Sequence, residues 1–450
     1  MLKSLVPVSK GTVLRCIACG NASELLSERA FVCTSCGGLL EVHHDFSGMN
    51  SGMVTELKHL FDSRAVQRIG NSRTPQTASG VWRFQELIMP NLQPEHIVTL
   101  GEGLVPIVHA GKHLHEWLGG DIDVSLILEG LGPTGSFKDF GGTVMMSVAK
   151  AAGVKAVGCA STGDTSAMAA AYATAAGIMC FVLLPKGKVT PVQLMQPAAH
   201  GAQVITLPGT FDDCMRVMRE LVANYGAYPA NSLNPARIEG HQATVFLIAQ
   251  AMEWSLPDWF AVPVGNGSNS SSIGKGIRLL KDLGFVKTAS RILGCQAEAA
   301  NPLARSWPMV RDVQEGERLE AWRREFRPMT VGETTATAAR IGDPVSREKV
   351  MREVVSSNGV MTTSTERDLN EAIFVCARDG YLVCPQTGIA LAGLRNAIQD
   401  GHVLKGERVV VVSTATGLKF SSAFESRTED VCIEAEDTRT STVARILELL

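Results

Sequence analysis

The chain has no excess of charge of either sign: 42 Lys and Arg face 45 Asp and Glu over 450 residues, a formal net charge of −3 at pH 7. This balance argues against a nucleic-acid partner and against an anionic membrane surface. No apolar run approaches the ~20 residues that cross a bilayer. Residues 1–10 contain no long apolar segment before a cleavage site, so no signal peptide is expected. These absences predict a cytoplasmic protein with no nucleic-acid partner and no membrane partner.

Cysteine is too sparse for a disulfide scaffold, with 11 in 450 residues. Several of these cysteines lie inside apolar runs with the character of strands, where a small buried thiol packs well; they are Cys159, Cys180, Cys295 and Cys384. This usage indicates a reducing compartment.

Four cysteines near the N-terminus stand apart from the others. Cys16 and Cys19 form one CxxC pair, and Cys33 and Cys36 form a second after thirteen intervening residues. Each short turn directs two thiolates at one point, which suits tetrahedral Zn²⁺, and four thiolates leave no open coordination position for chemistry. We therefore expect a zinc-ribbon-like segment over residues 1–45 with a structural metal; unmetallated thiols are the alternative.

Strand-like apolar runs alternate with helical segments from about residue 122 onward. The expected strands are 124–128, 156–160, 180–184, 203–207, 259–264, 291–296 and 408–413, and 166–176 and 211–225 are expected helices. The alternation predicts an α/β fold with parallel sheets built from βαβ units. Ligands of such folds bind near the carboxyl ends of the strands.

Lys138 lies in the first of three unusual loops that join a strand to a helix. The loop, residues 129–139, is rich in small residues and brings Lys138 to the start of the next helix. A lone lysine is usually solvated. Beside a helix N-terminus, however, the positive end of the helix dipole and the loss of water lower the amine pKa, which favours imine formation with an aldehyde.

The second and third loops carry hydroxyl groups and glycines at helix starts. Residues 161–166 read Ser-Thr-Gly-Asp-Thr-Ser, which suits a carboxylate or phosphate site or an ordinary helix cap. Residues 265–272 read Gly-Asn-Gly-Ser-Asn-Ser-Ser-Ser. Ser270 stands where a dinucleotide fingerprint needs its third Gly, and Asn269 stands where a Walker A loop needs its first Gly. A phosphate cradle without a nucleotide fingerprint is the remaining interpretation.

Together with other segments these loops resemble the threonine synthases, fold-type-II pyridoxal-phosphate (PLP) enzymes, and especially their plant-like branch. The resemblance runs from about residue 15 to residue 422. Its segments are 39–46, 129–139, 159–167, 231–240, 257–259, 263–266, 341–346, 385–388 and 412–419.

The resemblance implies a tryptophan-synthase-β-like PLP fold, α/β with three layers, in two domains behind the zinc-ribbon-like segment. The large PLP domain would comprise 46–138 and 256–450, and the small α/β domain 139–255. It further implies conversion of O-phospho-L-homoserine and water to L-threonine and phosphate, and a homodimer.

The resemblance also implies a role for individual residues. Lys138 would form the Schiff base with PLP and, once released, act as general base. Gly265, Asn266, Gly267, Ser268 and Asn269 would cradle the cofactor phosphate; Asp164 would lie near the 3′-hydroxyl, and Thr414 would bind the pyridine nitrogen. Ser161, Thr162 and Thr165 would hold the substrate carboxylate and its neighbours, and Arg237 with Ser232 the substrate phosphate.

Four positions depart from the family pattern. Ser268 stands where Gly is usual, His241 where Gln is usual, Thr416 where His is common, and Phe140 where Arg or Leu is usual. A Cβ at Ser268 would be strained if its φ were positive. The departures keep open a related PLP enzyme of β- or γ-replacement, either cysteate-synthase-like on O-phosphoserine or in secondary metabolism. A non-catalytic zinc-ribbon protein is the alternative of another class.

Overall fold

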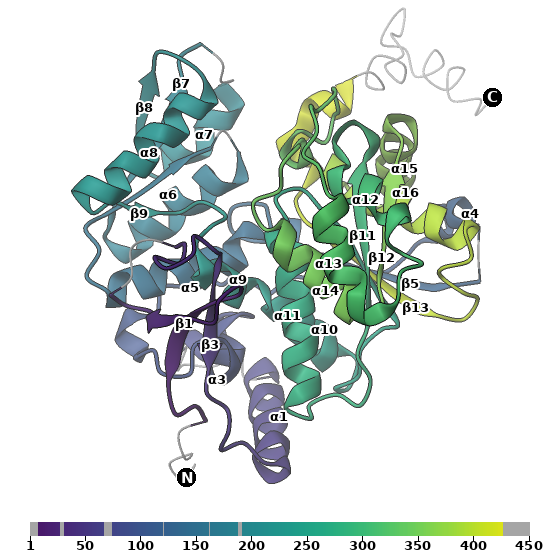
Figure 1. The fold of residues 1–450 in the computed structure, drawn as a ribbon, viewed down its shortest axis with the longest axis horizontal. Helices are drawn as coiled ribbons and strands as arrows, with labels where there is room; N and C mark the ends of the chain where they lie inside the picture. The colour runs from purple at the N-terminus through teal and green to yellow at the C-terminus, as the bar shows by residue number, and fades with distance from the viewer. Residues whose placement is uncertain are drawn as a thin grey trace, which may run out of the picture.

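A six-stranded sheet forms the core of the larger of two lobes (Figure 1). The computed structural model describes residues 8–27, 31–66, 74–119, 121–161, 163–187 and 191–425. The strand order is β12-β11-β10-β13-β5-β4, and every neighbouring pair is parallel except the edge pair β4–β5. The strands are β4 (Ile107–His109), β5 (Asp123–Leu128), β10 (Trp259–Pro263), β11 (Arg291–Ala297), β12 (Val360–Ser364) and β13 (Arg408–Ser413).

Helices cover both faces of this sheet because its strands present apolar side chains to both sides. Val410 and Val412 of β13 belong to one buried cluster, shared with α10, α11, α12 and α14, whereas Val409 and Val411 belong to another, shared with α4, α15 and α16. The helices around this sheet are α4 (Lys112–Leu118), α10 (Ala243–Ala251), α11 (Ser268–Asp282), α12 (Pro302–Ser306), α13 (Glu315–Glu325), α14 (Arg347–Ser356), α15 (Glu366–Arg378) and α16 (Pro385–Gln399). Sheets buried on both faces read as continuous apolar runs, as the sequence showed.

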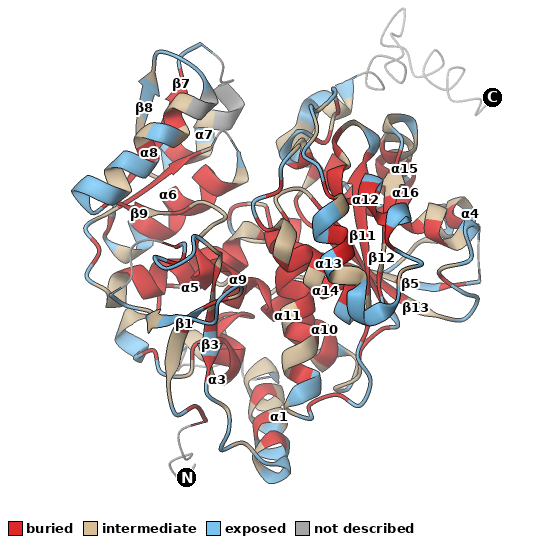
Figure 2. Cartoon of the chain, in the orientation of Figure 1, coloured by how far each residue is buried: buried red, intermediate tan, exposed pale blue. Residues whose placement is uncertain are grey.

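A four-stranded parallel sheet, in the order β8-β7-β6-β9, forms the second lobe (Figure 1). Its strands are β6 (Ala156–Ala160), β7 (Met179–Pro185), β8 (Gln203–Leu207) and β9 (Tyr228–Pro229). The helices of this part of the chain are α5 (Lys138–Ala151), α6 (Asp164–Ala176), α7 (Pro191–Ala199), α8 (Phe211–Tyr225) and α9 (Pro235–His241). In both lobes most of the strands and the helix faces against them are buried, whereas the edge strand β8 is largely exposed (Figure 2).

The N-terminal part forms a small antiparallel sheet, β2-β1-β3, and a helical connection. Its elements are β1 (Thr12–Cys16), β2 (Ala22–Glu24), β3 (Leu40–His44), α1 (Ser51–Val66), α2 (Pro75–Ala78) and α3 (Gln85–Ile88). The 3₁₀ helices are η1 (Trp82–Phe84), η2 (Pro94–His96), η3 (Glu129–Leu131), η4 (Glu298–Ala300), η5 (Trp307–Met309), η6 (Thr337–Ala339) and η7 (Gly417–Ala423). Within the described chain, no helix has the length and hydropathy to span a bilayer.

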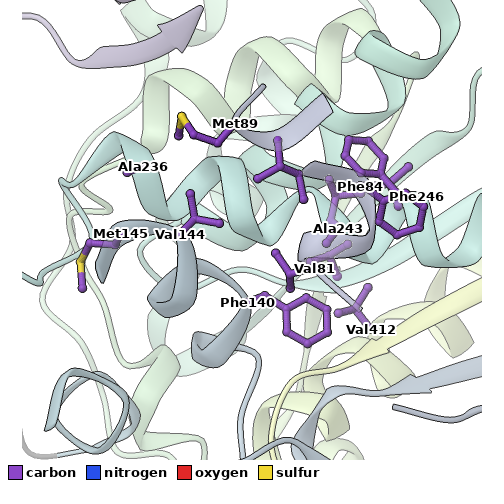
Figure 3. Close-up of a cluster of buried hydrophobic side chains, with 14 of the residues drawn as sticks. Val81, Phe84, Met89, Phe140, Val144, Met145, Ala236, Ala243, Phe246 and Val412 are labelled. Carbon is purple, nitrogen blue, oxygen red and sulfur yellow. The ribbon is translucent and has the colours of Figure 1, made fainter. Parts of the chain in front are cut away.

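One hydrophobic cluster joins the two lobes. Phe84 and Phe246 meet edge to face with ring centroids 5.6 Å apart, and Phe140 lies in the same cluster with Val81 and Val412 (Figure 3). Phe140 is fully buried on α5. The departure at this position is therefore a core residue.

Candidate functional site

Lys138 is the first residue of α5 and follows the loop that leaves β5. The Phe137 N–H donates to the Thr414 carbonyl at 2.7 Å, which joins this loop to the end of β13. The Lys138 Nζ lies 3.5 Å from the centroid of the Phe137 ring. Loss of water around the amine lowers the pKa of Lys138 to about 7; Asp164 opposes this shift, and Arg237 adds to it. At neutral pH a large fraction of this amine is unprotonated and nucleophilic.

Hydrogen bonds from several segments fix the loop before Lys138. Asp139 accepts from the N–H and the hydroxyl of Thr134, at 2.9 and 2.6 Å. The Thr134 carbonyl accepts from Lys419 Nζ at 2.9 Å and from Gln196 Nε2 at 3.2 Å. Gly135 has φ +81°, and a Cβ there would lie 3.2 Å from the Lys419 side chain. These bonds fix the backbone of the loop on both sides of Lys138.

The candidate phosphate cradle lies between β10 and α11. Gly267 caps α11 with φ +86°, and a Cβ at this glycine would lie 2.5 Å from Val350 Cγ2. Ser268 is the first helical residue and has no positive φ; among the described residues only Glu253, Trp254 and Asn358 combine a side chain with positive φ. The strain anticipated at Ser268 therefore does not arise, because Gly267 takes the left-handed conformation.

Asn269 supplies the strongest indication of a ligand at this cradle. Its side chain is 5% exposed, and neither its Oδ1 nor its Nδ2 has a hydrogen-bond partner in the described part of the chain. A buried amide without partners costs free energy unless a ligand or water satisfies it. Together with the N–H groups at the start of α11, this side chain fits a bound phosphate group.

Thr414 directly follows β13, on the wall of the same site. It is buried, and its hydroxyl lies 3.4 Å from Cys384 Sγ. Its N–H donates to the Thr387 hydroxyl at 3.3 Å, and that hydroxyl lies 3.2 Å from the hydroxyl of Ser413. The groups around Thr414 are thus hydroxyls and a thiol, which suit a neutral heteroaromatic nitrogen.

Arg237 is a fully buried cation with no acidic partner among the described residues. It lies in α9, which begins where the Asn234 side chain accepts from the Ala236 N–H at 3.1 Å. The Arg237 Nη1 donates to the Ala230 carbonyl at 3.0 Å, whereas Nε and Nη2 have no partner. Burial lowers its pKa to about 10, so the guanidinium stays charged at neutral pH. A buried unpaired cation is costly, and two free N–H donors in its planar fork suit the oxygens of a phosphate.

The other proposed substrate residues come from two turns. Ser161 accepts from the Gly163 N–H at 3.3 Å, Thr165 is buried in the first turn of α6, and Ser232 is half-buried before α9. Thr162 lies outside the described residues. Sequence reasoning missed Asn231, whose Nδ2 donates to the Ala160 carbonyl at 3.2 Å while its buried Oδ1 has no partner. The sequence feature that could have identified Asn231 is its position in the segment 231–240, which resembles the family.

Asp164 begins α6 and pairs with Lys419, with 2.7 Å between Oδ1 and Nζ. Lys419 was also missed, although it closes the segment 412–419. Thr416, the third departure, caps η7 by accepting from the Leu418 N–H at 3.3 Å. The Thr416 side chain therefore has a structural role as the cap of this helix.

His241 is the last residue of α9 and is buried against α5. Its ring centroid lies 4.9 Å from that of Phe137, and a Cβ on Gly141 would lie 2.6 Å from its Cε1 and Nε2. Burial holds its pKa well below the usual range, and the charges of Arg237 and Lys138 add to this effect. His241 is therefore neutral, and it packs against the helix that begins with Lys138.

Glu129, also missed from the sequence, is a second buried acid near Lys138. The Thr244 hydroxyl donates to its Oε1, whereas Oε2 has no partner in the described chain. Burial raises the pKa of Glu129 to about 8, against the opposing effects of Thr244 and Lys138. At neutral pH the carboxyl is thus mainly protonated, which avoids a buried negative charge.

The four N-terminal thiols converge at one point. The Sγ atoms of Cys16, Cys19, Cys33 and Cys36 lie within 4.8 Å of one another. The backbone N–H groups of Ser35 and Cys36 lower the pKa of Cys33 to about 6, which favours a thiolate. A donor set of four sulfurs in this arrangement fits tetrahedral Zn²⁺.

Comparisons with known proteins agree on one family. A family model described as "Pyridoxal-phosphate dependent enzyme" matches residues 98–415. The Arabidopsis thaliana protein "Threonine synthase 2, chloroplastic" is 37% identical over 392 residues, 86% of this chain and 73% of the relative. The threonine synthase of Methanocaldococcus jannaschii is 35% identical over 427 residues, 94% of this chain and 96% of the relative.

Solved structures show the same fold. The threonine synthase from Escherichia coli matches with a TM-score of 0.66 at 19% identity, over 96% of this chain and 94% of that one. Maize serine racemase matches with a TM-score of 0.60 at 15% identity, over 79% of this chain and 98% of that one. At these identities the likeness concerns the fold, and it confirms the expected tryptophan-synthase-β-like α/β fold.

Proposed function

The chain belongs to the threonine synthases within the PLP-dependent enzyme family, and we propose that it converts O-phospho-L-homoserine and water to L-threonine and phosphate. The observation that carries the proposal is that two groups suited to this chemistry lie in one site. Lys138 has an amine that is readily unprotonated at neutral pH, and Arg237 is a buried cation without an anion.

We propose that Lys138 holds PLP and that the residues around it bind the rest of the cofactor. The orphaned side chain of Asn269 and the N–H groups after Gly267 would hold its phosphate, and Thr414 its pyridine nitrogen. Asp164 would face its 3′-oxygen. When bound, PLP supplies an electron sink for negative charge that develops at the substrate α-carbon.

The chain's own residues would then orient the substrate and move its protons. Arg237, with Ser232 and Asn231, would hold the leaving phosphate, and the turn at Ser161 and Thr165 the carboxylate. The Lys138 amine, released from the cofactor, would take the α-proton, since its pKa of about 7 suits a general base at neutral pH.

Two further features belong to this proposal. We propose a structural Zn²⁺ at Cys16, Cys19, Cys33 and Cys36, supported by the convergence of their sulfur atoms. We also propose a homodimer, which light scattering of the purified protein would test.

A substrate comparison tests the function. The PLP-loaded protein is incubated separately with O-phospho-L-homoserine and O-phospho-L-serine, and phosphate and amino-acid products are both quantified, with Lys138→Ala as control. We expect threonine and phosphate in equal amounts from the first substrate only, and neither from the variant. Phosphate from O-phospho-L-serine alone would establish the related enzyme of β-replacement instead. Phe140, Ser268 and Thr416 are a core residue, a helix start and a helix cap, so His241, which is buried beside Arg237 and Lys138, is the departure to which that outcome would direct attention.

A further inference from the structure

Lys419 joins three segments of the site through one ammonium group. It lies in η7, after β13, and its Nζ is 2.7 Å from Asp164 Oδ1 at the start of α6. The same Nζ donates to the Thr134 carbonyl, 2.9 Å away, in the loop before Lys138. The Lys419 and Asp164 side chains are 19% and 10% exposed, so water screens this ion pair only weakly.

Lys138 lies in the field of this pair. Its amine is surrounded by titratable or charged groups from every side of the site: Asp164 on α6, Arg237 and His241 on α9, Glu129 on η3, Cys384 before α16 and Lys419 on η7. Arg237 and Lys419 favour the neutral amine, and Asp164 is the strongest influence toward the protonated one. Glu129 adds little negative charge, because burial keeps its carboxyl protonated.

We propose that Lys419 is a positioning residue that keeps the Asp164 carboxylate in an ion pair with itself, and so leaves the Lys138 amine neutral and free to react with the cofactor aldehyde. The inference rests on the proposed function, which makes Lys138 the PLP lysine. Without Lys419, the Asp164 carboxylate would be an unpaired anion facing that amine. The amine would then hold its proton, and its lone pair would not be available.

The reaction at stake is the loading of the cofactor. The Nζ lone pair of the neutral amine forms the bond to the aldehyde carbon, and the carbon–oxygen double bond becomes a carbon–nitrogen double bond. The aldehyde oxygen leaves as water, which carries the two hydrogens of the amine. A protonated amine has no lone pair for the first step, so the loading rate follows the neutral fraction of Lys138.

The test measures loading without turnover. Full-length protein freed of PLP is mixed with PLP, and the rate at which the visible band of lysine-bound cofactor appears is followed against pH. We expect Lys419→Met to move the midpoint of this profile to higher pH by about one unit, so that the rate near neutral pH falls by about fivefold, and by about tenfold well below the midpoint, while the high-pH rate is unchanged. Lys419→Arg keeps the charge and should retain a profile near that of the unmodified protein.

The ion pair provides its own controls. Asp164→Asn should move the midpoint to lower pH, and the double variant Lys419→Met, Asp164→Asn should restore a midpoint close to the unmodified one, because both charges are gone. Only the midpoints of these two variants are compared, because Asp164 is also proposed to face the cofactor. Lys405→Met removes a lysine whose pairing with Asp121 is largely exposed, and it should change nothing. Circular dichroism checks that each variant is folded. If Lys419→Met alone does not fold, the midpoints of the Lys419→Arg, Asp164→Asn and double variants can still be compared with that of the unmodified protein.

Two results would overturn the inference. One is a folded Lys419→Met variant whose profile keeps its midpoint, whether at full rate or lowered equally at every pH, since an equal loss would mark a packing role. The other is a double variant as shifted as Lys419→Met alone. Failure of the proposed function would look different, because the unmodified protein itself would then form no visible band with PLP.

Discussion

At the scale of single residues, the site combines buried polar groups that have no hydrogen-bond partner within the described chain. Arg237 is buried with two free donors, Asn269 with two free polar atoms, and Glu129 with one free oxygen. A folded protein keeps such groups only at a cost to stability. We therefore read them as places where a ligand completes the structure.

Replacing Arg237 by Met should move stability and activity in opposite directions. The variant removes a buried, unpaired cation and fills similar space, so the free energy of unfolding of the unliganded protein should rise by about 1 kcal/mol or more. The value of kcat/KM for O-phospho-L-homoserine should fall by roughly 100-fold or more, because charge-assisted hydrogen bonds to the phosphate are lost. Urea unfolding and steady-state kinetics measure the two effects.

Arg216→Met, at an exposed arginine on α8, is the matched control and should leave kcat/KM unchanged. A structural role for Arg237 would instead make Arg237→Met less stable.

Glu129→Gln should flatten the pH dependence of stability. The Glu129 pKa is raised from 4.5 to about 8, so between these values the folded chain binds more protons than the unfolded chain. The stabilising contribution of the protonated carboxyl is fully present below pH 4.5 and is lost as the pH rises through about 8. In the variant, the decline of the free energy of unfolding over this window should be smaller by up to about 1.4 kcal/mol per pH unit.

Urea titrations of the unliganded protein across the window measure this slope, with the exposed Glu116→Gln as control. An unchanged slope would show that Glu129 is ionised in the folded state.

From the sequence alone, only residues that lie in short motifs between a strand and a helix could be predicted as parts of the site. Lys138 and residues 265–269 follow strands and begin helices, so their spacing alone marks them as candidates. Glu129 and Lys419 are single charged residues whose partners, Thr244 and Asp164, are more than a hundred positions away. Nothing local distinguishes such residues from solvated surface charges until the fold brings them to the site.

At the scale of elements, the turn between β10 and α11 determines the shape of the cradle. Gly267 takes the left-handed conformation directly before the first helical residue, with Val350 packed where a Cβ would lie. The N–H groups of the first turn of α11 are consequently free to face an anion.

Gly267→Ala should damage this turn, whereas Ser268→Gly should be tolerated. Alanine at φ +86° is strained and its Cβ meets Val350 at 2.5 Å, so we expect a loss of about 1–3 kcal/mol in stability and weaker PLP binding. Glycine at the first helical position should cost no more than about 1 kcal/mol. Thermal unfolding and PLP titration of both variants measure the contrast; equal effects would contradict the assigned backbone roles.

The elements themselves were largely predictable. Each of the seven strands expected from apolar runs exists with ends within one residue of the prediction. Six of them are buried along most of their length and are therefore apolar almost throughout, whereas β8 is largely exposed and is apolar at Val204, Ile205 and Leu207 only. The order of the strands was not predictable from periodicity, since pairing depends on side chains distant in sequence. The sequence analysis did not predict β4, β9 and β12: β4 and β9 are very short, and in β12 (Val-Met-Thr-Thr-Ser) only the first two residues are apolar.

At the scale of the whole molecule, buried charges attach the N-terminal sheet to the lobes. Lys275 donates to the Val42 carbonyl at 2.6 Å and pairs with Glu239 of α9, the helix that also carries Arg237. Lys349 donates to the Leu40 carbonyl at 2.7 Å. The position of β3 is thus linked to the helix of the candidate phosphate site. We further propose that the small domain spans 139–255, which includes the whole four-stranded sheet.

Loss of metal from the four-cysteine cluster should therefore lower the stability of the molecule. Zinc measured by mass spectrometry should approach one ion per chain, and its removal by a chelator, or Cys33→Ser, should reduce Tm by roughly 4–8 °C for a loss of about 2 kcal/mol. Cys214→Ser, at a buried thiol of the small lobe, controls for the general loss of a cysteine. A zinc-free protein with unchanged Tm would contradict the metal assignment.

The most direct test of the account asks whether the cofactor at Lys138 carries out threonine formation. The PLP-loaded protein is reduced with borohydride for increasing times, and each sample is assayed with O-phospho-L-homoserine and digested for peptide mass analysis. We predict one phosphopyridoxyl group per chain on the peptide with Lys138, and threonine formation that falls in proportion to this label. A label on another lysine, such as Lys419 or Lys275, or activity that persists after Lys138 is fully labelled, would contradict the account.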